Sequence, residues 1–224
     1  MLFIRVVARL YMIDTLVNLF NFCFPFLLII GFVIFIIKMV LRQRVRFINE
    51  QKQIAANLGL NYVPPLSKST GYPSIEGQMN QFYARIGYRV INESSFDHRI
   101  IYQTFQISFP HSLNMGLMIK PEGVINKLLS NVMTNDDVKV NDKLFDDTFN
   151  IQVADPNYLM QFLTLKRKTL MYNSAVSLSQ LGVNFTINDI MIQGERIFRP
   201  EPQNQQMYYI INEFVTIATA LTNQ

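Results

Sequence analysis

The sequence predicts an α+β protein: an N-terminal single transmembrane helix and a stem helix, followed by an antiparallel-sheet domain with two longer C-terminal helices. Three observations predict this fold. One long segment near the N-terminus lacks charge, several later segments alternate apolar and polar residues, and two C-terminal segments place apolar residues at helical spacing. The 224 residues suffice for one sizeable domain and an appendage.

The uncharged segment is long enough to cross a membrane. Residues 15–37 are 23 consecutive positions without a charged side chain. A hydrocarbon core of roughly 30 Å needs about 20 helical residues. A surface helix would show a polar stripe, whereas this segment is apolar on every face. A buried core helix is one alternative. A cleaved signal peptide is disfavoured, because its apolar core is roughly 7 to 15 residues long and ends at small residues.

Basic residues follow the span and predict its orientation. Two Lys or Arg residues precede it, and four follow it closely: Lys38, Arg42, Arg44 and Arg46. By the positive-inside rule, the larger cluster places the C-terminal bulk in the cytoplasm. An N-terminal flank that itself stays inside is the alternative. We expect the four side chains to contact the membrane surface, because a juxtamembrane cation gains roughly 1 kcal/mol beside an anionic leaflet.

The positive charge of the chain, +4 overall, lies at this membrane end. Residues 1–52 carry a net +5 and residues 53–224 carry −1. A nucleic-acid binder would carry its basic patch on the domain, so no nucleic acid is expected as a partner. The single cysteine, Cys23, excludes an internal disulfide, which fits a cytoplasmic domain. The remaining basic cluster, Lys-Arg-Lys at 166–168, is interpreted as a solvated helix face, with a phosphate or lipid-headgroup contact as the alternative.

The domain boundaries follow from these segments. We expect a short flank over 1–14, the transmembrane helix over 15–40, a basic stem helix over 41–60 and a soluble α+β domain over 61–224. Gly59 suits the left-handed position that follows a helix C-terminus. The prolines within 63–73 indicate a loop.

Alternation of apolar and polar residues predicts the strands of the domain. They are expected over 82–91, 101–109, 117–120, 138–140 and 145–153, with a short helix over 124–133. Gln103 breaks the alternation in the second of these strands. Residues 183–187 and 190–192 flank Asn188-Asp189 as a predicted hairpin.

Two C-terminal segments predict helices. Asp155 can cap a helix that Pro156 begins, and apolar residues continue its face to about Tyr172. The last helix is expected from Met207 to Leu221 and contains one charge. A helix so poor in charge either packs in the core or offers a surface to a partner.

Several motifs within the domain resemble those of a known group. Residues 74–80, Ser-Ile-Glu-Gly-Gln-Met-Asn, lead into an alternating strand, residues 142–149 give Asp-x-x-Phe-Asp-x-x-Phe, and residues 167–170 give Arg-x-x-Leu on a helix. Together they resemble prokaryotic membrane-anchored α+β domains of unknown function, over roughly residues 55–200. The chain departs from the pattern at Asn80-Gln81, where a second glycine and an arginine usually follow. The resemblance implies the fold and anchoring in a bacterial plasma membrane, and it implies no activity.

The sequence contains no motif for catalysis, cofactor binding or metal binding. The glycines form no G-x-G-x-x-G, P-loop or G-x-S-x-G pattern, and neither His98 nor His111 belongs to an H-E-x-x-H motif. No catalytic residue, cofactor or metal is therefore expected. The five aspartates within 136–147 lack the calcium-loop pattern, so we interpret them as turn and cap carboxylates. On the expected strand, Asp146 and Asp147 would point to opposite faces.

The leading hypothesis is a membrane-anchored, cytoplasm-facing domain that works by binding, as an interaction or scaffold component. Its expected partners are the lipid bilayer and either another protein or further copies of the chain. The alternative is a membrane-associated hydrolase or transferase with a site assembled from scattered residues such as Asp97, His98 and Asp146. A third hypothesis is sensing of anionic lipid through the arginines of the stem.

Overall fold

The structure is a computed structural model that describes residues 2–65, 71–92, 99–122, 137–199 and 204–223. The chain divides into two compact units, Met1–Asn49 and Glu50–Gln224. The first unit is helical, and the second is an antiparallel sheet with further helices, so the predicted α+β class is confirmed. The short helix expected over 124–133 lies outside the described residues.

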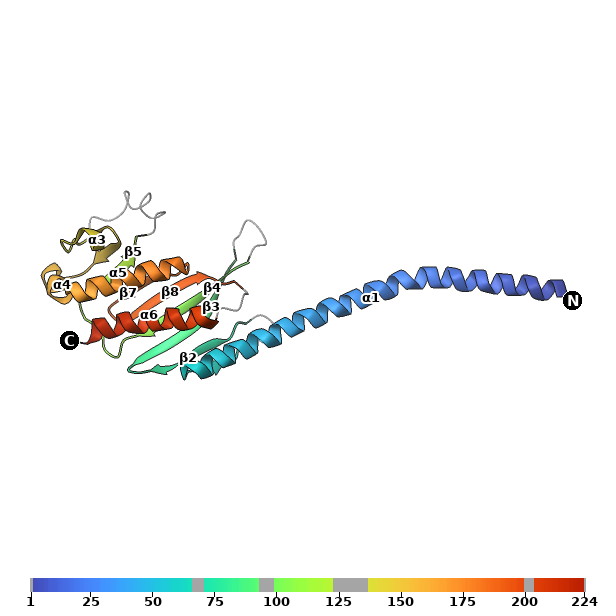
Figure 1. The fold of residues 1–224 in the computed structure, drawn as a ribbon, viewed down its shortest axis with the longest axis horizontal. Coiled ribbons are helices and arrows are strands. Elements are labelled where there is room, and N and C mark those ends of the chain that lie inside the picture. The colour runs from blue at the N-terminus through green and yellow to red at the C-terminus, as the bar shows by residue number, and fades with distance from the viewer. Residues whose placement is uncertain (1, 66–70, 93–98, 123–136, 200–203, 224) are drawn as a thin grey trace. The chain divides into compact units, whose positions relative to one another are not determined.

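The long helix α1 spans Leu2–Leu58 without interruption (Figure 1). From Phe24 to Arg46 every side chain is exposed, although most of these residues are apolar. Among the described residues, α1 is the one helix long and apolar enough to cross a membrane, and none of its apolar window is buried. The alternative of a buried core helix is therefore wrong for this window. The limits expected for flank, span and stem stay predictions, because one continuous helix runs through all three.

The last turns of α1 belong to the second unit, which begins at Glu50. Ile54 and Ala55 are 1% and 2% exposed and join the hydrophobic core. The helix ends as predicted at Gly59, which takes φ +67°, and the amide of Leu60 donates to the carbonyl of Ala55 at 2.8 Å. Glycine adopts this positive φ at little cost, which lets the chain turn directly into the sheet.

The centre of the second unit is an eight-stranded sheet in the order β1-β2-β3-β4-β8-β7-β5-β6. Every neighbouring pair is antiparallel. The strands are β1 Asn61–Val63, β2 Ser74–Met79, β3 Phe82–Asn92, β4 Arg99–Ser108, β5 Met118–Pro121, β6 Phe149–Gln152, β7 Asn184–Asn188 and β8 Met191–Ile197. The first four strands form a meander. The next two strands in sequence, β5 and β6, lie at the opposite end of the sheet, beyond β8 and β7. The two halves of the sheet therefore join along β4 and β8.

Periodicity predicts the central strands correctly. β3 and β4 cover the two long alternating segments, and Ala84 faces Ile107 in their register, both fully buried. The predicted hairpin is also confirmed, since β7 and β8 meet at Asn188-Asp189. There the side-chain oxygen of Asn188 accepts from the amides of Ile190 and Met191, at 3.0 and 2.9 Å. The alternation does not predict the short strand β1 or the glycine-containing strand β2.

Helix α6 (Asn204–Thr222) packs across the sheet. Phe214 lies near Phe105 of β4 and Phe185 of β7, with ring centroids 6.3 and 6.0 Å away. Gly194 of β8 makes this approach possible, because a Cβ there would lie 2.6 Å from the Phe214 ring. Helix α5 (Leu165–Gln180) runs beside α6 over the same face of the sheet (Figure 1). Of the two roles expected for the charge-poor C-terminal helix, the structure shows packing in the core.

The helix expected over 156–172 is wrong as a single element. It consists of α4 (Pro156–Phe162), which Asp155 caps as predicted, followed by α5. Leu163 leaves the helical conformation at φ −83° and ψ 71°, and Thr164 starts α5 by accepting from an amide of its first turn. Apolar residues keep helical spacing across this break, so the pattern does not reveal it.

The strand expected over 145–153 is wrong in its first half. Residues Lys143–Asp146 form the short helix α3, and the strand β6 begins only at Phe149. Asp142 starts α3 by accepting from the amide of Phe145 at 3.3 Å. A capping aspartate favours a helical turn over an extended chain. Residues 138–140 form no strand of their own.

Candidate functional site

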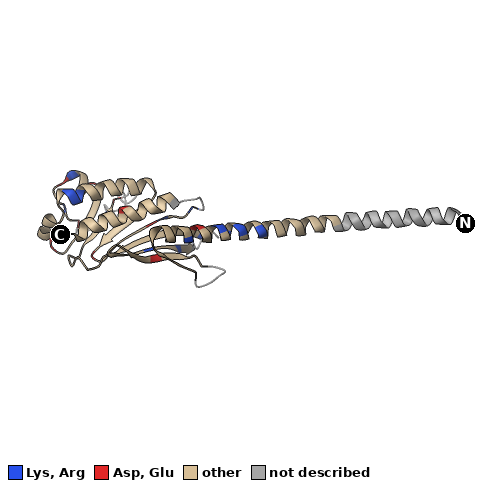
Figure 2. Ribbon diagram, turned by 60° about the horizontal axis from the view of Figure 1, so that its bottom comes forward, with Lys and Arg blue, Asp and Glu red and all other residues tan. Residues whose placement is uncertain are grey.

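The four basic residues expected at the membrane surface lie on the exposed part of α1. At about 100° per residue, Lys38, Arg42 and Arg46 fall within an arc of roughly 80°, and Arg44 lies on another side of the helix. Figure 2 shows the basic residues of this part as blue bands on the helix. The arc gives the helix one predominantly basic side. Its contact with a membrane surface stays a prediction.

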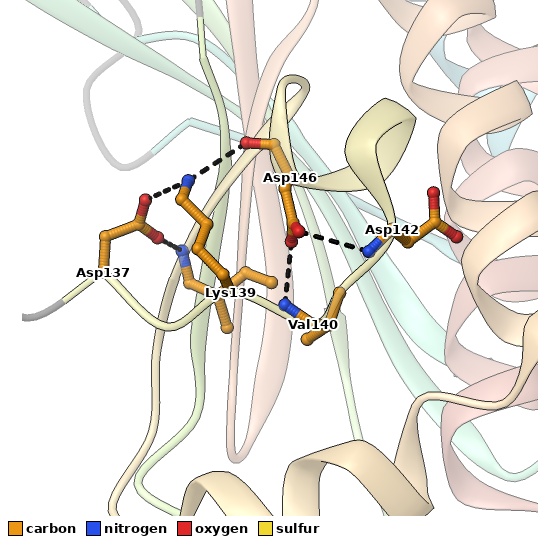
Figure 3. Close-up of polar contacts among 6 residues, drawn as sticks. Asp137, Lys139, Val140, Asp142 and Asp146 are labelled. Atoms are coloured by element: carbon orange, nitrogen blue, oxygen red, sulfur yellow. Dashed lines mark hydrogen bonds and ion pairs between the residues drawn. The ribbon is translucent and has the colours of Figure 1, made fainter.

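In the acidic cluster before β6, Asp142 and Asp146 are cap and turn carboxylates, as the sequence predicts (Figure 3). The two carboxylate oxygens of Asp146 accept from the amides of Val140 and Asp142, at 2.9 and 3.2 Å. Asp142 caps α3 and pairs with Lys168 of α5 at 3.0 Å. The hydrogen bond from Lys168, with the backbone amides that Asp142 also accepts from, holds the pKa of its carboxyl below the ordinary value. Asp147 ends α3, so its expected place on a strand is wrong.

Part of this cluster also closes one edge of the sheet. β6 is an edge strand, and such a strand presents unpaired backbone groups that other chains can bind. Here the amide of Val138 donates to the carbonyl of Ile151, and the amide of Ile151 donates to the carboxylate of Asp137, both at 2.9 Å. Lys139 pairs with Asp137 and donates to the carbonyl of Asp146 at 3.1 Å (Figure 3). These groups therefore complete the sheet.

A catalytic site built from Asp97, His98 and Asp146 cannot be traced in the described residues. Asp97 and His98 lie outside them, as does Asp136 of the acidic cluster. Both oxygens of Asp146 hold backbone amides in a turn. Within the described residues no group of three His, Cys, Asp or Glu side chains could hold a metal ion. The structure thus assigns Asp146 a structural task.

A chain of polar side chains lies buried in the second unit. The Tyr88 hydroxyl donates to Gln51 of α1 at 3.1 Å, and the Gln103 amide donates to that hydroxyl at 3.3 Å. Arg196 of β8 donates to Gln103 and to Gln206 of α6, both at 2.9 Å. Gln51, Gln103 and Arg196 are 4%, 1% and 5% exposed. The chain of hydrogen bonds joins the last turns of α1 to three strands and to α6.

Burial sets the protonation of this polar chain. It raises the pKa of the Tyr88 phenol, so the hydroxyl stays neutral and can both donate and accept. It lowers the pKa of Arg196, whose guanidinium also lies 5.7 Å from the centroid of the Phe105 ring. Sequence reasoning missed this chain of polar side chains, although the break in the alternation at Gln103 indicated one of its members. The partners could not be read from the pattern, because Arg196 is 93 positions from Gln103.

An open groove lies among α4, α5, α6 and the loop that follows β4. Its volume is about 1180 Å³. Apolar side chains from all of these elements line it: Leu113, Phe162, Leu170, Val215 and Leu221. Hydroxyl, amide and basic groups complete the lining, in which no described residue is Asp or Glu. This combination of apolar surface and a few polar groups is typical of ligand sites.

Arg167 forms part of the wall of this groove and ties its helices together. The guanidinium donates to the carbonyls of Phe162, Ala220 and Asn223, each at 2.7 Å. It also lies 4.4 Å from the centroid of the Phe162 ring. Burial lowers the pKa of Arg167. The solvated helix face expected here is therefore wrong at Arg167, as it is at the ion-paired Lys168.

Comparisons with known proteins do not assign a family. No family model matches the chain, and no curated protein matches it. A solved structure, the mycobacterial trehalose monomycolate transport factor A, TtfA, aligns with a TM-score of 0.47 at 10% sequence identity. The alignment covers 79% of this chain and 97% of that one. The function therefore has to follow from the residues of this chain.

Proposed function

We propose that the chain is a single-pass membrane protein whose cytoplasmic α+β domain acts by binding, as an interaction or scaffold component. The supporting observation is the continuity of α1. Its residues from Phe24 are apolar and exposed, and the same helix ends with Ile54 and Ala55 in the core of the sheet domain. An exposed apolar helix of this length is stable in a lipid bilayer. The bilayer is thus the first partner.

Binding is the role that the described domain surface supports. On β3, the residues that alternate along the strand with buried core residues, such as Tyr83 and Arg85, are exposed. Ion pairs of Arg85 with Glu76 and of Arg89 with Glu195 lie along this face of the sheet. A non-obligate interface is about as polar as the rest of a protein surface and has a polar rim, so this face has a composition that a reversible interface can have. The second partner in the proposal is another protein or a second copy of the chain.

The basic side of α1 supports the proposed orientation. Lys38, Arg42 and Arg46 follow the apolar residues directly and face one way, where the cytoplasmic leaflet supplies negative charge. Arg44, on another side, can still reach headgroups because a long side chain extends towards the interface. Together these four residues support the proposed orientation, with the domain on the cytoplasmic side of a bacterial plasma membrane.

Anchoring and orientation are tested on the full chain in native membranes. The chain should stay in the membrane pellet after alkaline extraction. Added protease should digest the domain in inside-out vesicles and leave it intact in sealed right-side-out vesicles. Release by alkali would contradict anchoring, and digestion in right-side-out vesicles would reverse the orientation.

The binding role is tested by crosslinking in the same membranes, followed by mass spectrometry. Crosslinks are expected between residues of the second unit and either one protein or a second copy of the chain. A matched control keeps the domain and replaces residues 15–37 by an unrelated uncharged span. Partners that need the domain persist in this control. A chain that is monomeric and crosslinks to nothing in both forms would contradict a scaffold role.

A further inference from the structure

The groove among α4, α5 and α6 contains features that the proposed scaffold role does not explain. It belongs entirely to the second unit, and its apolar lining comes from three helices and the loop after β4. Helix α6 contributes residues from Val215 to Thr222, a length of about 10 Å at 1.5 Å per residue. The volume of about 1180 Å³ exceeds the range of roughly 300 to 1,000 Å³ for small-molecule sites. An elongated ligand suits it better than a compact one.

The charge of the groove has one sign. Among the described residues, its lining includes Lys166 and Arg167 and no carboxylate side chain. Two other lysines of the domain are paired with acids, Lys168 with Asp142 and Lys139 with Asp137. In the part of the chain that the structure describes, Lys166 has no such partner. An anionic group would therefore meet a complementary field here.

Arg167 adds a fixed positive charge rather than a mobile one. Its three hydrogen bonds to backbone carbonyls use three of the five N–H groups of a guanidinium. Those bonds and the Phe162 ring hold the group in place, so a ligand does not have to order it. Preorganised donors of this kind cost less entropy on binding than flexible ones.

The walls favour a hydrocarbon chain over a peptide. The hydroxyls of Thr216 and Thr219 donate to carbonyls of their own helix, at 2.8 and 2.7 Å. Their donors are thus already used, and apolar side chains such as Val215 and Leu221 lie beside them in the lining. A peptide backbone placed here would lose hydrogen bonds to water, at a cost in free energy for each unmatched group. A hydrocarbon chain has no such groups to satisfy.

We propose that this groove binds a long-chain carboxylate, an anionic amphiphile with a single hydrocarbon chain. The chain lies against the apolar lining along α6, and the carboxylate binds at Lys166 and Arg167. His111, which also lines the groove, is a further polar group at the rim. The proposal goes beyond the scaffold role and does not rest on the membrane span, because all of its residues lie in the second unit.

The test uses the full chain in nanodiscs of zwitterionic phosphatidylcholine. A hexadecanoate that bears a photoactivatable diazirine in its chain is added, and crosslinked peptides are mapped by mass spectrometry. Crosslinks are expected on residues 158–170 and 215–223. The corresponding long-chain alcohol, which has the same chain without the charge, should label these peptides about tenfold less, as the loss of one charged contact predicts. Equal labelling by acid and alcohol, or labelling confined to residues 15–37, would overturn the proposal.

Two variants at exposed positions separate charge from shape. Lys166→Glu reverses the charge and should lower labelling by hexadecanoate about tenfold. Thr216→Trp fills the groove from α6 and should lower labelling by acid and alcohol alike. The matched control is Lys120→Glu, an exposed residue of β5 outside the groove, which should leave labelling unchanged. Unchanged labelling in Thr216→Trp would overturn the proposal even if the Lys166 variant failed to fold.

Discussion

The two ends of α1 share one secondary structure and differ in everything that surrounds them. From Phe24 to Ile37 every position is apolar and exposed. Near the other end, the buried or half-buried positions are Gln51, Ile54, Ala55 and Leu58, a spacing of i, i+3, i+4 and i+7. A helix that is apolar on all sides suits an apolar solvent that surrounds it. A helix with one apolar stripe packs only that side against a protein core. The distribution of apolar residues, more than their number, therefore distinguishes a bilayer from a protein interior.

The largest effect is expected from charges in the exposed apolar part. Leu28→Asp combined with Ile30→Asp should cost roughly 5 to 7 kcal/mol of insertion free energy, from about 2.5 to 3.5 kcal/mol per central charge. The chain should move from the membrane pellet to the soluble fraction, measured by sedimentation after alkaline extraction. Thermal unfolding of the domain should not change. Leu28→Ala with Ile30→Ala is the matched control, and retention of the doubly charged variant in the membrane would break the comparison.

The next effect is expected at the buried end of the same helix. Ile54→Ala should lower the free energy of unfolding of the domain by about 2 to 5 kcal/mol, because a buried side chain leaves a cavity. Membrane retention should stay as in the parent chain. Limited proteolysis and thermal melting of the reconstituted chain measure this. Leu41→Ala, at an exposed position of α1, should leave the melting temperature unchanged, and equal destabilisation by both would show that the two ends do not differ.

A smaller effect is expected where α1 joins the polar chain. Tyr88→Phe removes the hydroxyl that links Gln51 to Gln103, and leaves buried amide groups with fewer partners. The expected loss is about 1 to 3 kcal/mol of unfolding free energy. Denaturant unfolding monitored by circular dichroism measures it. Tyr83→Phe, on the exposed face of the same strand, should change stability by less than about 0.5 kcal/mol. Similar losses in both variants would argue against a role for the buried hydroxyl.

The smallest effect concerns the basic side between the two ends. A peptide of residues 38–52 should bind anionic vesicles, and Arg46→Gln should weaken binding roughly fivefold, since one juxtamembrane cation contributes about 1 kcal/mol. Salt should weaken the parent peptide more than the variant. Gln43→Ala, at an exposed uncharged position, is the control. Binding that ignores both salt and Arg46 would remove the electrostatic explanation for the orientation.

Sequence patterns predicted elements whose residues face one environment along their whole length. The exposed apolar part of α1, the strands β3 and β4 and the helix α6 are of this kind, and their periods are regular apart from Gln103 in β4. The break at Leu163-Thr164 escaped because the apolar residues keep helical spacing across these two non-helical positions. α3 escaped because Phe145 and Phe149, whose rings lie 4.5 Å apart, fit a period of two or of four equally well.

The candidate sites depended on contacts between distant residues, which no local pattern contains. Arg167 donates to the carbonyl of Ala220, 53 positions later, and a backbone carbonyl leaves no mark on the sequence. The same holds for the groove, whose lining comes from residues 81 to 223. Gln103 was different, because an amide within an alternating strand is visible by itself. Sequence reasoning therefore signals a buried polar residue more readily than it names its partners.

The closed edge at β6 also limits how copies of the chain can meet. Molecules held on one surface encounter each other at high local concentration, where an open strand would recruit its neighbour into a continuous sheet. Val138 and Asp137 occupy the hydrogen-bonding positions of Ile151 from within the same chain. At the opposite edge, β1 is only three residues long. With both edges limited in this way, neighbouring domains would contact one another through side chains. Such contacts are reversible when the local concentration falls.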